Sequence, residues 1–239
     1  MSTPHSSLIA TRPSLSTRFG SDAGRDVSLG SPTRPSWRGR VHLIALYLAV
    51  PALTLLIVFA DTTRARVGIA LYAAGLSSML TVSVTYHRWV NSLRARSGWR
   101  RADHAMIFAA IAGSSTPIAL IVMPGAAGTA LLAVIWSASL AGAGFKIARW
   151  GRGDGVGSIF YAGVSVLAGL LLPALWRHGG VRPALLFMVA GGLYIAGAIS
   201  FGKHWPRLRP SVFGYHEVWH VFTVVAAGAH FAAVWAIAT

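Results

Sequence analysis

Residues 41–60 read VHLIALYLAVPALTLLIVFA and contain no charged side chain. An α-helix rises about 1.5 Å per residue, so about 20 apolar residues cross the roughly 30 Å hydrocarbon core of a bilayer. Six more apolar segments of similar length follow, at residues 67–90, 102–123, 126–145, 156–176, 183–202 and 214–238. The sequence therefore predicts an all-α integral membrane protein built as a bundle of seven transmembrane helices.

The composition supports a membrane protein over a soluble one. Of the 239 residues, 54% are hydrophobic and 11% are charged, against about 25% charged in ordinary soluble domains. The absence of cysteine excludes disulfides and thiolate metal ligands. A net charge of +15 could suit nucleic acid, but the basic residues fall between apolar runs and not on one face of a soluble module. We expect a multi-pass protein of the cell membrane that does not bind nucleic acid.

The chain divides into two regions. Residues 1–36 are rich in Ser, Thr, Pro, Gly and Arg and lack sustained apolar periodicity, which predicts a disordered, basic cytoplasmic tail. Residues 37–239 form the predicted seven-helix transmembrane domain. Within it, the short turn around Pro124 predicts a tight hairpin between the third and fourth spans. Pro51, Pro117 and Pro173 could kink their helices.

The distribution of Lys and Arg predicts the orientation. Of these 21 residues, 17 lie in the N-terminal tail and in the second, fourth and sixth connections, and four lie on the other side. Cytoplasmic connections carry the excess of positive charge. We therefore expect a cytoplasmic N-terminus and an extracytoplasmic C-terminus.

Several ionisable residues lie within the predicted spans, where each costs about 2.5–3.5 kcal/mol at mid-helix and is a candidate functional residue. His216 and His220 are four residues apart and share a helix face, as in the metal-binding pattern H-E-x-x-H. The topology puts His87 and Asp103 at the same depth as this pair. Two imidazoles from one helix and His87 from another would make a three-histidine site that leaves a fourth position to water, the catalytic form of a zinc site. Ser83, one turn before His87, could hydrogen-bond that water or a neighbouring group.

Alternative interpretations stay open at this point. Each histidine could instead pack or hydrogen-bond near the membrane interface, and short H-E-x-x-H matches arise by chance. Glu217 could be a general base, as in soluble zinc proteases, or could bond to a partner within the bundle. His230 lies about 21 Å along the helix from His216, and it could line a deeper cavity or bond a neighbouring helix. The remaining histidines near spans are expected at the interface: His42, His178 and His204.

Three motif blocks resemble the hemolysin III-like family of the progestin and adipoQ receptor superfamily, which includes the adiponectin receptors. The blocks are S-V-T-Y-H at residues 83–87, D-H-A-M-I-F-A-A-I-A-G-S-S-T-P at residues 103–117 and G-Y-H-E-V-W-H at residues 214–220. Together they span most of residues 37–239. The resemblance implies a seven-helix bundle with Zn²⁺ bound by His87, His216 and His220. It also implies that Asp103 holds the metal-bound water and acts as general base, with Ser83 nearby.

The family is similar to membrane hydrolases that cleave lipid amides such as ceramide. By this analogy we expect a zinc-dependent hydrolase of a lipid amide or ester that serves membrane lipid homeostasis, with membrane lipids as substrates or ligands. Two alternatives are a receptor-like or regulatory protein with a structural zinc site and a hemolysin-type pore former. An intramembrane protease would need a carboxylate ligand on a distant helix, for which Asp103 is the candidate.

Overall fold

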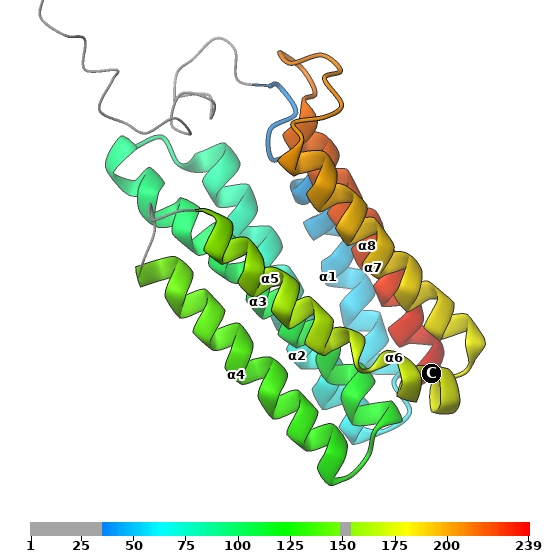
Figure 1. Cartoon of the computed structure of the whole chain (residues 1–239). Helices are drawn as coiled ribbons and strands as arrows, with labels where there is room; N and C mark the ends of the chain where they lie inside the picture. Colours follow the sequence, from blue (N-terminus) through cyan, green and yellow to red (C-terminus); the bar gives the residue numbers. More distant parts are fainter. Residues whose placement is uncertain (1–34, 149–153) are drawn as a thin grey trace, which may run out of the picture.

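The computed structural model describes residues 35–148 and 154–239, and these residues form an all-helical bundle (Figure 1). Among them are seven segments long and apolar enough to cross a membrane. The chain is therefore a multi-pass integral membrane protein. The helical elements are α1 (Arg40–Phe59), α2 (Thr63–Val84), η2 (Thr85–Trp89), α3 (Leu93–Val122), α4 (Ala126–Ala148), α5 (Asp154–Gly169), α6 (Leu172–Ala174), η3 (Leu175–Gly179), α7 (Val181–Gly202) and α8 (Tyr215–Ala238).

These elements confirm the seven predicted spans, and the main difference is at the start of α3. This helix begins at Leu93, nine residues before the predicted span begins at residue 102. The additional turns carry the basic residues Arg94, Arg96, Arg100 and Arg101. Hydropathy detects only the apolar part of a helix, so a polar extension of the same helix beyond that part escapes the prediction.

The fifth span is interrupted, as the position of Pro173 suggested. After α5 the amides of Leu170 and Leu171 donate to the carbonyls of Leu167 and Ala168, three residues back in each case. Proline lacks the amide hydrogen that would continue the regular ladder. The segment nevertheless continues through α6 and η3 as one span from Ile159 to Gly179.

Small residues allow the central helices α2 and α3 to pack closely. A Cβ atom at Gly75 would lie 2.5 Å from the Ala109 carbonyl oxygen, and one at Gly113 would lie 2.9 Å from the Leu71 carbonyl oxygen. Such close approach is typical of transmembrane packing. The predicted hairpin between α3 and α4 is confirmed, and Gly125 (φ 104°) supplies the left-handed conformation of its turn. The helices that carry His87 and Asp103 are thus held together by direct backbone contact.

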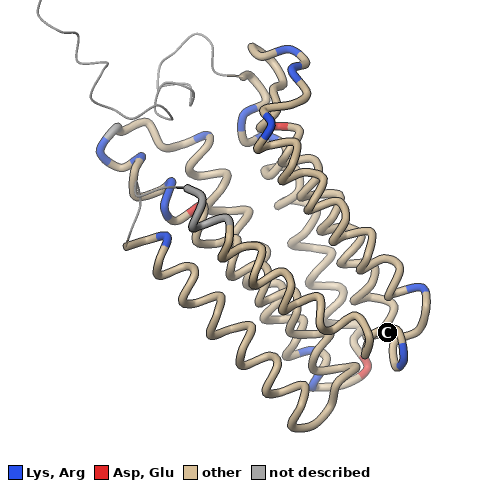
Figure 2. The backbone as a smooth tube through the Cα atoms, in the orientation of Figure 1, with Lys and Arg blue, Asp and Glu red and all other residues tan. Residues whose placement is uncertain are grey.

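The bundle has two distinct ends. In Figure 1, α1 begins at the top of the view and the C-terminus lies near the bottom, while α7 packs beside α8 and α1 contacts both α2 and α8. Figure 2 shows Lys and Arg at the two ends and an uncharged middle, the pattern expected of helices that cross a bilayer. We refer below to the end where α1 begins as the α1-start end. The predicted tail at residues 1–34 and the Arg149–Gly153 part of the fourth connection lie outside the described residues.

Candidate metal centre

The α8 helix positions two histidines on one face at the α1-start end. The helix begins after Gly214, whose amide donates to Glu217 Oε2 at 2.8 Å, so the carboxylate satisfies an amide hydrogen at the helix N-terminus. His216 and His220 follow one turn apart, and their ring centroids are 4.8 Å apart. His220 is buried, whereas His216 is partly exposed.

A π-helical turn supplies the third histidine. At the end of α2 the backbone widens into η2, where the Val90 amide donates to the Thr85 carbonyl at 3.0 Å. Single π-turns of this kind often occur at functional sites because they redirect side chains. His87 lies in this turn, and its Nε2 is 3.3 Å from His216 Nε2. One ligand atom from each of His87, His216 and His220 lies within 4.8 Å of the others.

This donor set could hold a metal ion. Two nitrogens bound to one tetrahedral zinc at about 2.0–2.1 Å would be roughly 3.3–3.4 Å apart, close to the 3.3 Å between His87 and His216. Imidazole suits zinc, copper, iron and nickel, so the three rings by themselves leave the metal's identity open. The predicted ligand residues therefore do meet in space, and the cluster could hold a metal.

Asp103 approaches the cluster from α3. Its Oδ2 is 3.8 Å from His87 Nε2 and 3.9 Å from His104 Nδ1, and its side chain is 15% exposed. His104 itself is tied to the backbone, because its Nδ1 is 2.9 Å from the Arg100 carbonyl oxygen. The structure thus brings Asp103 beside the histidines, as the shared depth suggested, at a distance longer than a direct hydrogen bond.

His42 lies buried inside the bundle, whereas the sequence predicts it at the membrane interface. Its ring is buried in α1 and stacks on the ring of His220, with centroids 3.8 Å apart and an interplanar angle of 4°. Its Nδ1 is hydrogen-bonded to Ser83 Oγ at 2.8 Å, and its Nε2 to Thr223 Oγ1 at 3.2 Å. Ser83 therefore reaches the cluster through His42, a contact that the sequence analysis missed. The position of His42 in the sequence could have indicated this contact, because it lies in the first turn of a span, at the same end of the bundle as His87.

Glu217 has a partner within the bundle, the second of its two predicted alternatives. It is 1% exposed, and Arg38 Nε donates to its Oε1 at 2.6 Å. Arg38 belongs to residues 35–39, which we call the strap. The amides of Ser36 and Trp37 in the strap donate to the carbonyls of Ser211 and Val212, each at 3.1 Å.

The strap crosses close to the metal-ligand candidate His87. Gly39 has φ 75°, and a Cβ atom there would lie 2.8 Å from Arg88 Cγ and 3.0 Å from His87 Cβ. Both the left-handed backbone and the lack of space favour glycine at this position. The strap and its ion pair therefore cover the η2 side of the cluster.

Three further histidines among the described residues lie away from the cluster. His230 bonds a neighbouring helix, the second alternative raised for it, with Nε2 3.1 Å from the Ser114 carbonyl oxygen. His204 contacts the Tyr215 ring, with centroids 4.7 Å apart. His178 is exposed in η3 at the opposite end of the bundle.

Comparison with known proteins agrees with the three motif blocks. Residues 31–231 match the family described as Haemolysin-III related. The chain is similar to Hemolysin-3 of Bacillus cereus, with 29% identity over 186 residues that cover 77% of this chain and 82% of that protein. It is also similar to the Hemolysin-3 homolog of Bacillus subtilis (strain 168), with 30% identity over 199 residues that cover 80% of this chain and 87% of that protein.

Proposed function

This chain belongs to the haemolysin-III-related family, and from that premise and the geometry above we propose that it is a zinc-dependent membrane hydrolase. Its substrate would be a lipid amide or ester of the cell membrane, and its role would lie in membrane lipid homeostasis. The observation that carries the proposal is the meeting of three imidazoles from two helices with one carboxylate beside them. Three histidines plus one further ligand position are typical of catalytic zinc sites.

His87, His216 and His220 would bind the zinc ion. Zinc in such a site supplies a Lewis acid that polarises a carbonyl group and acidifies a water molecule. His216 is the partly exposed ligand, so a substrate carbonyl would approach from its side. Burial of the other two rings restricts bulk water, which strengthens the electrostatic interactions within the site.

Asp103 would act as general base. Its Oδ2 lies 3.8 Å from His87 Nε2, the nitrogen that would bind the metal, so the carboxylate would lie within reach of a water molecule in the fourth ligand position. The carboxylate would orient this water, accept a proton from it and pass the proton to the leaving amine or alcohol. Ser83 would act by positioning, because its hydroxyl holds the His42 ring that stacks on His220.

The orientation follows the charge asymmetry. Arg and Lys concentrate at the α1-start end, where the histidines lie, so we propose that this end and the N-terminus are cytoplasmic. The site would then open near the cytoplasmic leaflet. An amide- or ester-linked lipid could reach it from that leaflet without crossing the membrane.

A second candidate is a regulatory or receptor-like protein in which the metal is structural. The observation that favours it is the way the cluster joins α8, the last helix, to the end of α2 beneath the strap. A metal there would stabilise the association of these helices. In this case metal binding would matter for stability, and Asp103→Asn would leave the activity of the protein unchanged.

The test has two steps. First, bound metals are measured by mass spectrometry on detergent-purified protein without a histidine tag, beside a His87→Ala, His216→Ala, His220→Ala variant. About one zinc per chain, absent from a folded variant, is the expected result. Second, release of fatty acid from a total lipid extract is followed for the wild type and Asp103→Asn.

The outcomes separate the candidates. Zinc-dependent turnover that is lost in Asp103→Asn supports the hydrolase. Zinc without turnover, with equal behaviour of Asp103→Asn, favours the structural role. The name Hemolysin-3 of the Bacillus cereus relative suggests lysis of membranes, and stable conductance in planar bilayers that survives loss of the three histidines would support a pore former instead.

A further inference from the structure

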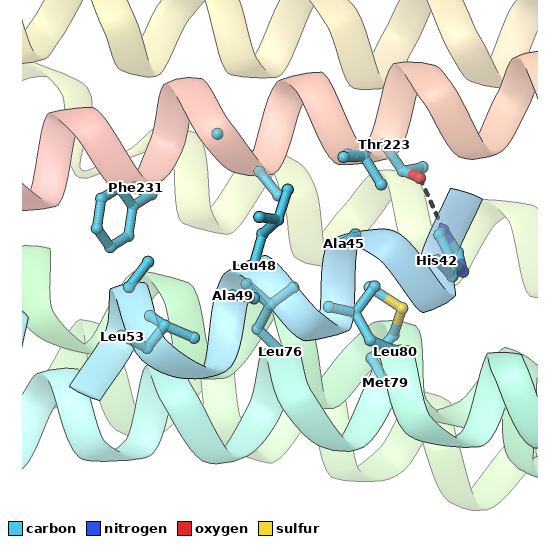
Figure 3. Close-up of a pocket in the computed structure, with 14 residues that line it drawn as sticks. His42, Ala45, Leu48, Ala49, Leu53, Leu76, Met79, Leu80, Thr223 and Phe231 are labelled. Atoms are coloured by element: carbon cyan, nitrogen blue, oxygen red, sulfur yellow. Dashed lines mark hydrogen bonds between the residues drawn. The ribbon is translucent and has the colours of Figure 1, made fainter. Parts of the chain in front are cut away.

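An apolar groove runs between α1, α2 and α8 (Figure 3) and has a volume of about 220 Å³. Small residues line it from two sides, namely Ala45, Ala49 and Ala52 on α1 and Ala227 and Gly228 on α8. Small residues usually allow transmembrane helices to approach closely. Here the two helices leave a space between them instead.

The groove has a buried floor and an open side. Leu53 and Leu80 in its wall are each 2% exposed, whereas Leu48 is 66% exposed. All of these residues lie within candidate membrane spans. The open side therefore faces the hydrocarbon of the bilayer, and a lipid chain could enter sideways.

Water is a poor occupant of this groove. Among the described residues that line it, the polar side chains are His42 and Thr223 at one end, and Figure 3 shows the hydrogen bond between them. The other ring nitrogen of His42 is bonded to Ser83. A buried water molecule needs two to four polar partners, and an empty groove would forfeit dispersion contacts along its walls. The walls thus favour an apolar occupant.

We propose that the groove binds one acyl chain of a membrane lipid. The groove extends along α1 from His42 to Leu53, about 16 Å at the rise of an α-helix, and it is parallel to the helices and hence to the chains of the bilayer. Its polar end lies at the α1-start end, where the exposed Arg40 precedes His42 by two residues. Basic residues at a membrane surface attract lipid headgroups, so the headgroup lies at this end.

The site goes beyond the proposed hydrolysis and does not depend on it. His42 lines the polar end of the groove, and its ring stacks on the ring of His220. An acyl chain in the groove is therefore separated from the histidine cluster by one ring. A lipid bound here contacts His42, which stacks on the metal-ligand candidate His220. This contact exists whether or not the cluster catalyses a reaction.

Photochemical labelling tests the proposal. The full chain is reconstituted into phosphatidylglycerol–phosphatidylcholine vesicles with a small fraction of phosphatidylcholine that carries a diazirine midway along one acyl chain. After irradiation, adducts are mapped by peptide mass spectrometry. We expect adducts to concentrate in residues 45–53 and 224–231, and to decrease when unlabelled lipid is added in excess at constant diazirine-lipid concentration.

Two variants fill the groove from opposite walls. A Cβ atom at Gly228 would have no neighbour within 4 Å, so Gly228→Phe can place a ring in the groove without displacing backbone. Ala49→Phe adds a ring from α1, where Ala49 lines the groove. Each should reduce groove adducts severalfold. Gly144→Phe on α4, where a Cβ atom also meets nothing within 4 Å, is the matched control and should leave them unchanged.

Two results would overturn the proposal. One is an even spread of adducts over all lipid-facing helices of the wild type, which would indicate ordinary boundary lipid and needs no variant. The other is unchanged groove labelling in both folded variants. Because labelling requires no turnover, loss of hydrolase activity in a separate assay would leave this result intact, and the two proposals fail independently.

Discussion

His42 illustrates how a residue's role depends on partners distant in the sequence. It contacts Ser83 in α2 and both Thr223 and His220 in α8, so one side chain in the first helix connects three helices. Groups that orient the ligands of a metal tune its affinity. The hydrogen bonds of His42 and the ion pair of Glu217 can each be removed by substitution of a single residue.

Replacing His42 tests its positioning role. His42→Phe keeps a ring next to His220 but removes the hydrogen bonds to Ser83 and Thr223, so the metal affinity should fall by about 10–100-fold. Competition with a chromogenic zinc chelator measures this affinity. The control His178→Phe alters an exposed histidine at the other end and should change nothing. Equal affinity in His42→Phe would show that the stacked ring alone suffices.

The ion pair between Arg38 and Glu217 should contribute to stability and not to metal binding. Removal of one partner of a buried pair typically costs about 3–5 kcal/mol, because it leaves an uncompensated charge. We expect this loss in Glu217→Ala and Arg38→Ala, and a smaller one in the Arg38→Met, Glu217→Met double variant. Chemical unfolding followed by circular dichroism measures it, with the exposed Arg64→Ala as control.

Metal content distinguishes this role from a catalytic one. If Glu217 only anchors the strap and the start of α8, folded Glu217→Gln should retain the metal and any hydrolase activity. Loss of activity with unchanged stability and metal content would assign it a catalytic role instead.

At the scale of elements, the π-turn η2 and the contact between α2 and α3 bring the cluster together. A regular helix through Thr85–Trp89 would orient His87 differently, because a π-turn places an additional residue in the turn. The close contact at Gly75 and Gly113 keeps Asp103 near His87. Packing of α2 against α3 away from the histidine cluster thus helps to hold Asp103 beside it.

Substitution at this contact should affect both stability and the site. Gly113→Ala would bring its Cβ atom to 2.9 Å from the Leu71 carbonyl oxygen, and such overpacking costs about 1–3 kcal/mol. Weaker metal retention should accompany the loss. The control Gly191→Ala, on α7 with no neighbour within 4 Å of the added atom, should be neutral or stabilising, since alanine favours helices. Equal stability of the two variants would contradict this account.

The seven spans of the protein place the start of α1 and the C-terminus at opposite ends of the bundle (Figure 1). The histidine cluster lies at only one of these ends, so the orientation decides which side of the membrane the site serves. The charge asymmetry predicts the cytoplasmic side.

Cysteine labelling tests the orientation, because the chain has no cysteine of its own. Ser97 and Ala127 are exposed residues at opposite ends. An impermeant maleimide should label Ala127→Cys in intact cells and Ser97→Cys only after the membrane is opened. The reverse pattern would place the cluster on the extracytoplasmic side.

The seven spans and the candidates His87, Asp103, His216 and His220 could be predicted from the amino-acid sequence. The length of an apolar segment and the spacing of residues along one helix depend only on neighbouring residues in the sequence. These predictions therefore needed no tertiary structure. The packing of the helices, in contrast, brings three pairs of side chains together: His42 stacks on His220, Ser83 is hydrogen-bonded to His42, and Glu217 pairs with Arg38. Those contacts join residues 41 to 179 positions apart, and they depend on which helix faces pack together, which periodicity within one helix does not specify.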